Sequence, residues 1–376
     1  MHPAPMLSTP KNDEVNARQI AFFAAFVLPV YKLLELPSIL ARFTGGDLLL
    51  PAFLQYLLQT GVLFALIFVA SRLDKPLFQV LEERIGKWAL VFYIAYTIYF
   101  LFAAVLPLLD LEKFIYAIFY DTSPTFFAFA FFFLFSAFVC TKGIKSLGRF
   151  ADLSLFLFLL PFFALLLMSI AEADATNLLP FFERKFGDTM YAMSYTSPHF
   201  SDVALLLPFI GNLRYKKNDN KKILIGYGAG AAFTLLFLGV FYGLYSSIAA
   251  REHYAFAKIA QYFPALTVIG RVDLLFVYAL TIVLFVFAST PLFCSVDCVC
   301  KVAGTRRRTL FSAILNISAF VFVLFGNRHY DFLYALFGRG LFPVFWVFSI
   351  VIPLCALFLL IKPKTQKQPK KETTYA

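Results

Sequence analysis

Charged residues are scarce in this chain: Asp, Glu, Lys and Arg make up 15% of its 376 residues. Soluble domains are about a quarter charged and about half apolar. In contrast, 61% of this sequence is hydrophobic, 50 residues are Phe, and the mean hydropathy is +0.78. The shortage of charge excludes a soluble globular protein and predicts an all-α integral membrane protein.

Cysteine and histidine are also few, with five and four residues respectively. The cysteines lie in or at the ends of apolar segments, which argues against a disulfide framework. Cys294, Cys298 and Cys300 are closely spaced, but no fourth ligand accompanies them, so we expect no metal site and no cofactor. The sequence contains no nucleophile elbow, Walker loop or zinc-binding helix, so we expect no enzyme activity and no catalytic residues.

Basic residues give the chain a formal net charge of +11, but their placement does not indicate nucleic-acid binding. They lie in short connections between apolar segments and in the C-terminal tail, as on the cytoplasmic face of a membrane protein. Residues 1–17 lack the features of a cleaved signal peptide and are expected to be a cytoplasmic tail. Residues 362–376 are expected to be a basic, disordered cytoplasmic tail.

Ten apolar segments approach or exceed the roughly 20 residues that a spanning helix needs. The sixth is the weakest, because it is short and begins with a polar cluster. The segments run near 19–41, 48–71, 88–109, 124–141, 149–171, 198–213, 222–249, 268–296, 309–326 and 340–361.

The distribution of Lys and Arg predicts the orientation of these ten segments. Twenty-three lie in the tails and in the connections after even-numbered segments, against nine in the other connections. The positive-inside rule then places both termini in the cytoplasm, as an even number of spans requires.

The first apolar segment contains two charged residues, Lys32 and Glu35, bracketed by Pro29 and Pro37. An ionisable group at that depth costs about 2.5–3.5 kcal/mol on insertion scales and usually marks a substrate or ion path. Proline disrupts the helical ladder, so we expect this helix to be interrupted at the charges. Two interpretations stay open: Lys32 could meet a carboxylate ligand or replace a cation, or it could pair with Glu35 and only stabilise the bundle.

The domain from 18 to 361 divides into two halves, a first repeat at 18–172 and a second at 198–361. The sixth segment opens the second half and is interrupted by Pro198 and Pro208. Interrupted segments at corresponding places in two halves are typical of a mid-membrane binding site in transporters. Because each half has five segments, the repeats would be inverted.

The start of the sixth segment contains His199 and Asp202, three residues apart and hence on one helical face. They could line a binding site or form a helix cap at the membrane surface, and they are too few for a metal site. In the third and eighth segments, tyrosines could line a pocket or simply pack. The full candidate substrate-binding set is Val30, Tyr31, Lys32, Glu35, Tyr96, Tyr99, Ser197, His199, Ser201, Asp202, Tyr278 and Thr281.

Two polar connections are expected on the outer face. In the longer one, residues 172–197, the stretch from Lys185 to Tyr195 could form a surface helix. In the other, Glu252 to Phe263 could lie along the membrane interface.

Several short motifs resemble those of a known family. They are Gln19 with Leu36-Pro37, Gly148 to Asp152 with Asn177 to Pro180, Asp202 to Phe209 before a Lys-rich loop, and Phe263 to Leu266 with Gly270 to Asp273. In these motifs the chain resembles the endospore germination permeases, the B-type subunits of spore germinant receptors in the amino acid–polyamine–organocation transporter superfamily.

The resemblance implies a ten-helix fold of five-plus-five inverted repeats, with helices 1 and 6 broken. It implies a pocket for an amino acid or related nutrient between helices 1, 3, 6 and 8. It also implies A-type and C-type partner subunits in the spore inner membrane. The family usually has glycine-x-glycine in helix 1 where this chain has Val30-Tyr31-Lys32.

Two other hypotheses stay open. One is a free-standing amino acid transporter coupled to a cation or a proton. The other is a membrane scaffold in which the Lys32–Glu35 pair is purely structural.

Overall fold

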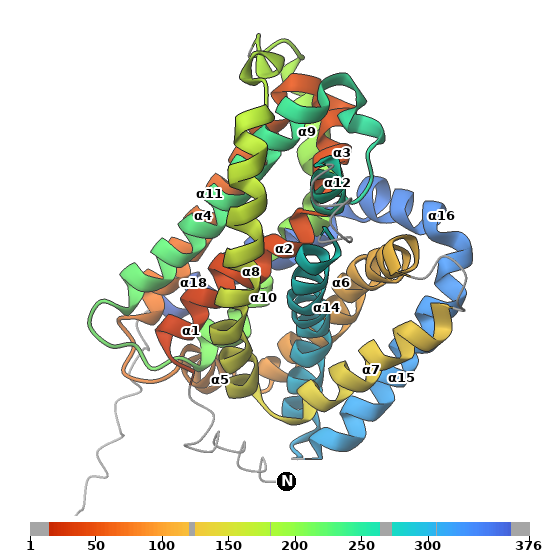
Figure 1. The fold of residues 1–376 in the computed structure, drawn as a ribbon. Coiled ribbons are helices and arrows are strands. Elements are labelled where there is room, and N and C mark those ends of the chain that lie inside the picture. Colours follow the sequence, from red (N-terminus) through yellow and green to blue (C-terminus); the bar gives the residue numbers. More distant parts are fainter. Residues whose placement is uncertain (1–14, 120–124, 181, 264–272, 306, 362–376) are drawn as a thin grey trace, which may run out of the picture.

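The computed structural model describes residues 15–119, 125–180, 182–263, 273–305 and 307–361. All regular structure within these ranges is helical (Figure 1). Most of the two tails and the motif at 264–272 lie outside the described residues, so the predictions for them stay predictions.

Seven helical stretches of the described chain are long and apolar enough to cross a membrane. The protein is therefore a multi-pass membrane protein, while the count of ten spans and the inverted repeat remain predictions. The stretches are built on α4 (Leu49–Ala70, preceded by α3), α6 (Trp88–Phe119), α8 (Ile144–Glu172), α11 (Asp219–Tyr245), α14 (Asp273–Ala303), α15 (Arg308–Gly326) and the run of α17 (Phe342–Trp346), η9 (Val347–Val351) and α18 (Ile352–Ile361).

Three further predicted segments are shorter or broken in the structure. The fourth is the 17-residue α7 (Thr125–Thr141), and the first and sixth are each divided into short helices. Other short elements connect the long helices. These are η3 (Gly45–Leu48), α5 (Leu77–Ile85), η4 (Ala175–Leu178), η6 (Ser246–Arg251), α12 (Ala255–Tyr262), η7 (Asn327–His329), α16 (Tyr330–Ala335) and η8 (Leu336–Gly340).

The first apolar segment is interrupted where its prolines predict. It consists of α1 (Ala17–Phe22), the π-helical turn η2 (Phe23–Val27), α2 (Leu28–Lys32) and α3 (Leu36–Thr44). Pro29 lies in the first turn of α2, and the wider π-helical turn before it is where the helical ladder changes register. Pro37 lies in the first turn of α3. The break between α2 and α3 falls between Lys32 and Glu35.

The sixth segment is also broken, but it begins earlier than predicted. Its first part is α9 (Phe186–Tyr195) followed by η5 (Ser197–Phe200), and its second part is α10 (Asp202–Asn212). The stretch from Lys185 to Tyr195 does form a helix, α9, and its position at the membrane surface stays a prediction. Ala192 and Met193 are buried, and α9 packs on α3 and α4. The many polar residues of this stretch concealed its short buried face.

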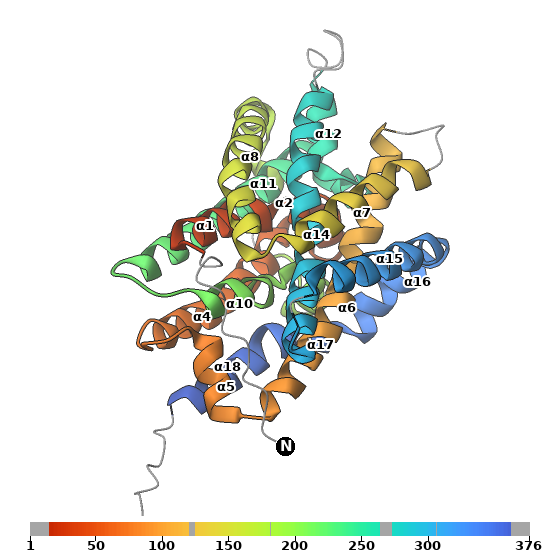
Figure 2. The ribbon, with the colours of Figure 1, turned by 90° about the horizontal axis from the view of Figure 1, so that it is seen from below.

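The broken first helix lies in the interior of the molecule. Figures 1 and 2 show α2 and α10 near the centre, with α4, α8 and α11 on one side and α7, α15 and α16 on the other. Two glycines of α11 allow a close approach to the first helix. A Cβ added to Gly226 or Gly230 would lie 2.5 Å from the carbonyl oxygen of Ala21 or Ala24, respectively. The backbone of α11 therefore packs directly on α1 and η2.

Candidate functional site

A buried ion pair joins the breaks in the first and sixth segments. Lys32 is the last residue of α2, and its Nζ lies 2.6 Å from Oδ1 of Asp202, the first residue of α10. The two side chains are 1% and 2% exposed. The proposed Lys32–Glu35 pair is therefore wrong as a description of this structure. Glu35 follows Lys32 by three residues, but the helix is broken between them, so the two side chains do not share a helical face. The Glu35 carboxylate instead lies 2.9 Å from Nδ1 of His253.

The Lys32 ammonium group is enclosed on the side of α2 that faces α4 and α11. It also lies 3.5 Å from the carbonyl oxygen of Leu28 and over the rings of Tyr56 and Phe200, at 5.5 and 5.3 Å. Asp202 accepts a second hydrogen bond, 2.9 Å long, from the hydroxyl of Tyr227. Both charges thus have close partners, as buried ions require.

Gln59 of α4 bridges the break in the sixth segment. Its Nε2 donates to the carbonyl of Phe200 at 2.8 Å, and its Oε1 accepts from the amide of Val203 at 3.2 Å. These are backbone groups that the interruption leaves without helical partners. Four residues earlier, Gln55 donates to the carbonyl of Met193 at 2.6 Å. The sequence analysis missed this face, although two glutamines four apart in an apolar helix are a detectable signal.

Tyr31 lies on another side of α2 and connects three other elements. Its hydroxyl donates to Oδ2 of Asp110 in α6 at 2.7 Å, and the Tyr330 hydroxyl donates to Oδ1 of the same carboxylate at 2.7 Å. The Tyr31 ring stacks between His199 and Phe287, with centroid distances of 4.8 and 5.2 Å. Asp110 is fully buried. The sequence analysis missed it because the predicted third segment ended one residue before it.

Polar atoms without partners lie in η5, next to the ion pair. Neither ring nitrogen of His199 nor the hydroxyl of Ser197 has a hydrogen-bond partner among the described residues. Both side chains are nearly inaccessible, at 3% and 1% exposed. Leaving a buried polar group unpaired costs about 1–3 kcal/mol. The hydrogen-bonding capacity of these two buried side chains is therefore unused among the described residues.

The remaining predicted site residues differ in their positions. Tyr96 donates to the carbonyl of Phe348 in η9. The Tyr99 hydroxyl lies 3.4 Å from that of Ser349 in η9 and also interacts with Ser201, so Tyr99 does reach the break in the sixth segment. Tyr278 is 51% exposed on the outside of α14 and is not brought to the break.

Three others have local or apolar surroundings. Val30 is fully buried in α2. Ser201 donates to the carbonyl of Pro198, and Thr281 donates to that of Val277 one turn earlier in α14.

The segment from Glu252 to Phe263 covers the first break, and its position along the membrane interface stays a prediction. The amides of Ala255 and Phe256, at the start of α12, donate to the carbonyls of Leu34 and Leu33 at 2.9 and 3.1 Å. These bonds satisfy carbonyls that the break leaves free.

The ion pair between His253 and Glu35, beside the start of α12, adds a second contact between this segment and the first break. The hydrogen bond from His253 to the buried Glu35 carboxylate, with the attraction between the two groups, raises the pKa of His253 above its usual value of about 6.5. When His253 is protonated, its ion pair with Glu35 holds the start of α12 against the break.

A family model described as "Spore germination protein", of the spore permease type, matches residues 52–330. The matched range begins after the broken first helix, so it does not include Lys32. A comparison with curated proteins finds no match.

The structure is similar to one solved as "MhsT in complex with L-phenylalanine". The TM-score is 0.61 and the sequence identity 14%, covering 92% of this chain and 89% of that one. At this identity the likeness concerns the fold alone.

Proposed function

The chain belongs to the spore germination protein family, and from that premise we propose that it is the nutrient-binding, permease-like subunit of a spore germinant receptor. The ligand is a small molecule such as an amino acid. It binds at the breaks of the first and sixth segments. The protein acts as a binding and conformational component of the membrane rather than as an enzyme.

One observation carries this proposal: the two breaks face each other across the Lys32–Asp202 ion pair, with unpaired polar groups beside it. Interrupted helices are tolerated at membrane depth only where protein or a cavity satisfies their backbone. Here Gln59 and α12 do so at the two breaks, which leaves His199 and Ser197 available to a ligand.

The ion pair is proposed to connect ligand binding to a change of conformation. Lys32 ends α2 and Asp202 starts α10, so the pair holds these parts of the two broken segments together. A ligand biases a conformational equilibrium only if it binds one state better than the other. His199 lies in η5, directly before α10. If the arrangement of the two breaks differs between the states, a ligand bound to His199 binds one state better and shifts the equilibrium toward it.

A free-standing secondary transporter is the second candidate. The observation that favours it is the likeness, over most of both chains, to MhsT, which was solved with L-phenylalanine bound. Uptake of a labelled amino acid by liposomes containing only this protein would support the transporter. A strict requirement for co-expressed A-type and C-type subunits would support the receptor.

The receptor role is tested in spores that lack the gene, complemented with wild type, His199→Ala or Tyr278→Phe. We expect the deletion and the His199 variant to lose the response to at least one nutrient. The control at Tyr278, half exposed on α14, retains it. An unchanged response of the deletion strain to every nutrient tested contradicts the proposal.

A further inference from the structure

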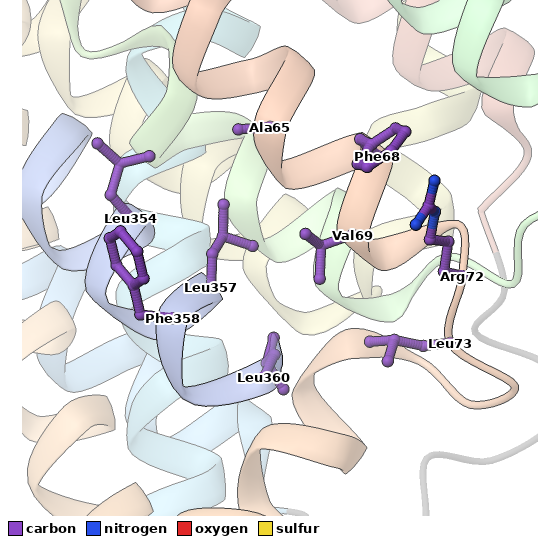
Figure 3. A pocket seen from close by; sticks show the side chains of 9 residues that line it. All are labelled: Ala65, Phe68, Val69, Arg72, Leu73, Leu354, Leu357, Phe358 and Leu360. Atoms are coloured by element: carbon purple, nitrogen blue, oxygen red, sulfur yellow. The ribbon is translucent and has the colours of Figure 1, made fainter. Parts of the chain in front are cut away.

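An apolar groove of about 600 Å³ lies between α4 and α18, close to the turn that leads to α5 (Figure 3). Leucines and a phenylalanine of α18 form one wall, and the last two turns of α4 form the other (Figure 3). The lining residues are Ala65, Phe68, Val69, Arg72, Leu73, Leu354, Leu357, Phe358 and Leu360.

The groove has one charged residue, Arg72, at its edge. The guanidinium carbon lies 3.9 Å from the centroid of the Phe68 ring, which holds the side chain beside the groove. No carboxylate of the described chain lies within ion-pair distance of Arg72. Arg84 of α5 donates to the carbonyl of Leu359 at 2.8 Å, so a second guanidinium lies near the same end of α18.

We propose that this groove binds an anionic phospholipid, with an acyl chain along the apolar lining and the phosphate at Arg72. A hydrocarbon chain needs a long apolar surface, which the leucines and Phe68 supply. A guanidinium group matches the oxygens of a phosphate with two parallel hydrogen bonds and is the preferred partner of such anions. Basic pockets between membrane helices bind anionic headgroups for this reason.

Charge selects the lipid over the chain's own C-terminal tail as the occupant. The tail follows α18 directly and contains five lysines and one glutamate between 362 and 376. Such a segment is repelled by Arg72 and attracted to the same anionic lipids. The Lys and Arg counts also predict that this end of the bundle faces the cytoplasm, where the leaflet surface is negative.

The test compares lipids that differ only in headgroup. The purified full-length protein, in a neutral detergent, is titrated with phosphatidylglycerol or phosphatidylcholine of identical acyl chains, and bound lipid is counted by native mass spectrometry. We expect the wild type to bind phosphatidylglycerol about tenfold more tightly, the gain of one charge-assisted, bidentate contact. Inorganic phosphate, the probe without an acyl chain, should not compete at the same concentration.

Three variants locate the binding. Arg72→Gln should lose the headgroup preference, because the exposed Arg72 contributes charge rather than packing. Ala65→Phe fills the groove and should weaken binding of both lipids. Lys142→Gln is the matched control, because the Lys142 ammonium group also lies over a ring, that of Phe138 at 4.7 Å, but just after the end of α7 and away from the groove. Equal affinity for the two lipids, an Arg72 variant that behaves like the Lys142 control, or undiminished binding by Ala65→Phe overturns the proposal.

Discussion

Replacing Lys32 with Met should destabilise the fold far more than the same change at a surface lysine. The Lys32–Asp202 pair is 2.6 Å long with both side chains at most 2% exposed. Removing one member of such a pair leaves the other buried and uncompensated, which costs about 3–5 kcal/mol. Lys75 offers the matched control, because its 2.5 Å pair with Glu83 is 51% and 44% exposed. An exposed pair contributes about 0–1 kcal/mol, so Lys75→Met should change little.

A double-mutant cycle separates the pair from its surroundings. Asp202→Asn alone should also destabilise, because Lys32 then lacks a counter-charge and Tyr227 lacks its carboxylate acceptor. Lys32→Met combined with Asp202→Asn removes both charges, so its cost should be clearly smaller than the sum of the single costs.

Thermal unfolding of the four proteins of the cycle and of Lys75→Met, in one detergent, can follow the reaction of a thiol-reactive dye with the buried cysteines, such as Cys294 and Cys298. The reasoning is refuted if Lys32→Met costs no more than Lys75→Met, or if the single costs simply add.

The remaining predictions use the same unfolding measurement. Gly226→Ala should cost about 1–3 kcal/mol, because its Cβ would meet backbone 2.5 Å away. Gly228→Ala, with open space, should be neutral or stabilising, and similar costs at both sites would contradict the close approach. Gln59→Leu should cost about 1–3 kcal/mol for each backbone group it leaves unpaired. Pairing with Glu35 raises the pKa of His253, so the pair should stabilise the wild type fully below about pH 6.5 and no longer do so as pH rises through the raised pKa. The difference in stability between the wild type and His253→Gln should therefore be largest at low pH and vanish at high pH. A pH-independent difference would contradict this.

Local sequence signals identified the broken first helix but not the partner of its charge. Lys32 was recognisable because a lone cation in an apolar run has to be compensated, and the flanking prolines located the break. Its partner Asp202 lies 170 residues further along the chain. A rule based on spacing in one helix favoured Glu35 instead, since it assumes an uninterrupted helix between the two.

Helix ends and helix faces were the harder features. Asp110 was missed because the predicted segment ended at the first acidic residue, whereas α6 continues to Phe119. Tyr278 and Thr281 are three residues apart in α14, yet they are 51% and 7% exposed. Nothing in an apolar helix surrounded by lipid distinguishes its outer face by polarity, so sequence alone could not choose between them.

The two breaks are covered by groups that differ in how far a sequence pattern indicates them. The cover over the first break comes from the backbone amides of Ala255 and Phe256. Since every residue except proline has such an amide, no side-chain pattern indicates this contact. The glutamine bridge over the second break was readable in principle, because Gln55 and Gln59 lie on one helical face.

The most direct measurement is a ligand-stabilisation screen of the purified protein over amino acids, sugars and nucleosides, repeated on His199→Ala. A ligand at about 100 times its dissociation constant adds roughly 2.7 kcal/mol of apparent stability. If the ligand binds at the two breaks, the compound that stabilises the wild type should no longer stabilise the His199 variant, while Tyr278→Phe responds as the wild type does. An undiminished response of His199→Ala to that compound, or no response of the wild type to any compound, would contradict a ligand site at the breaks.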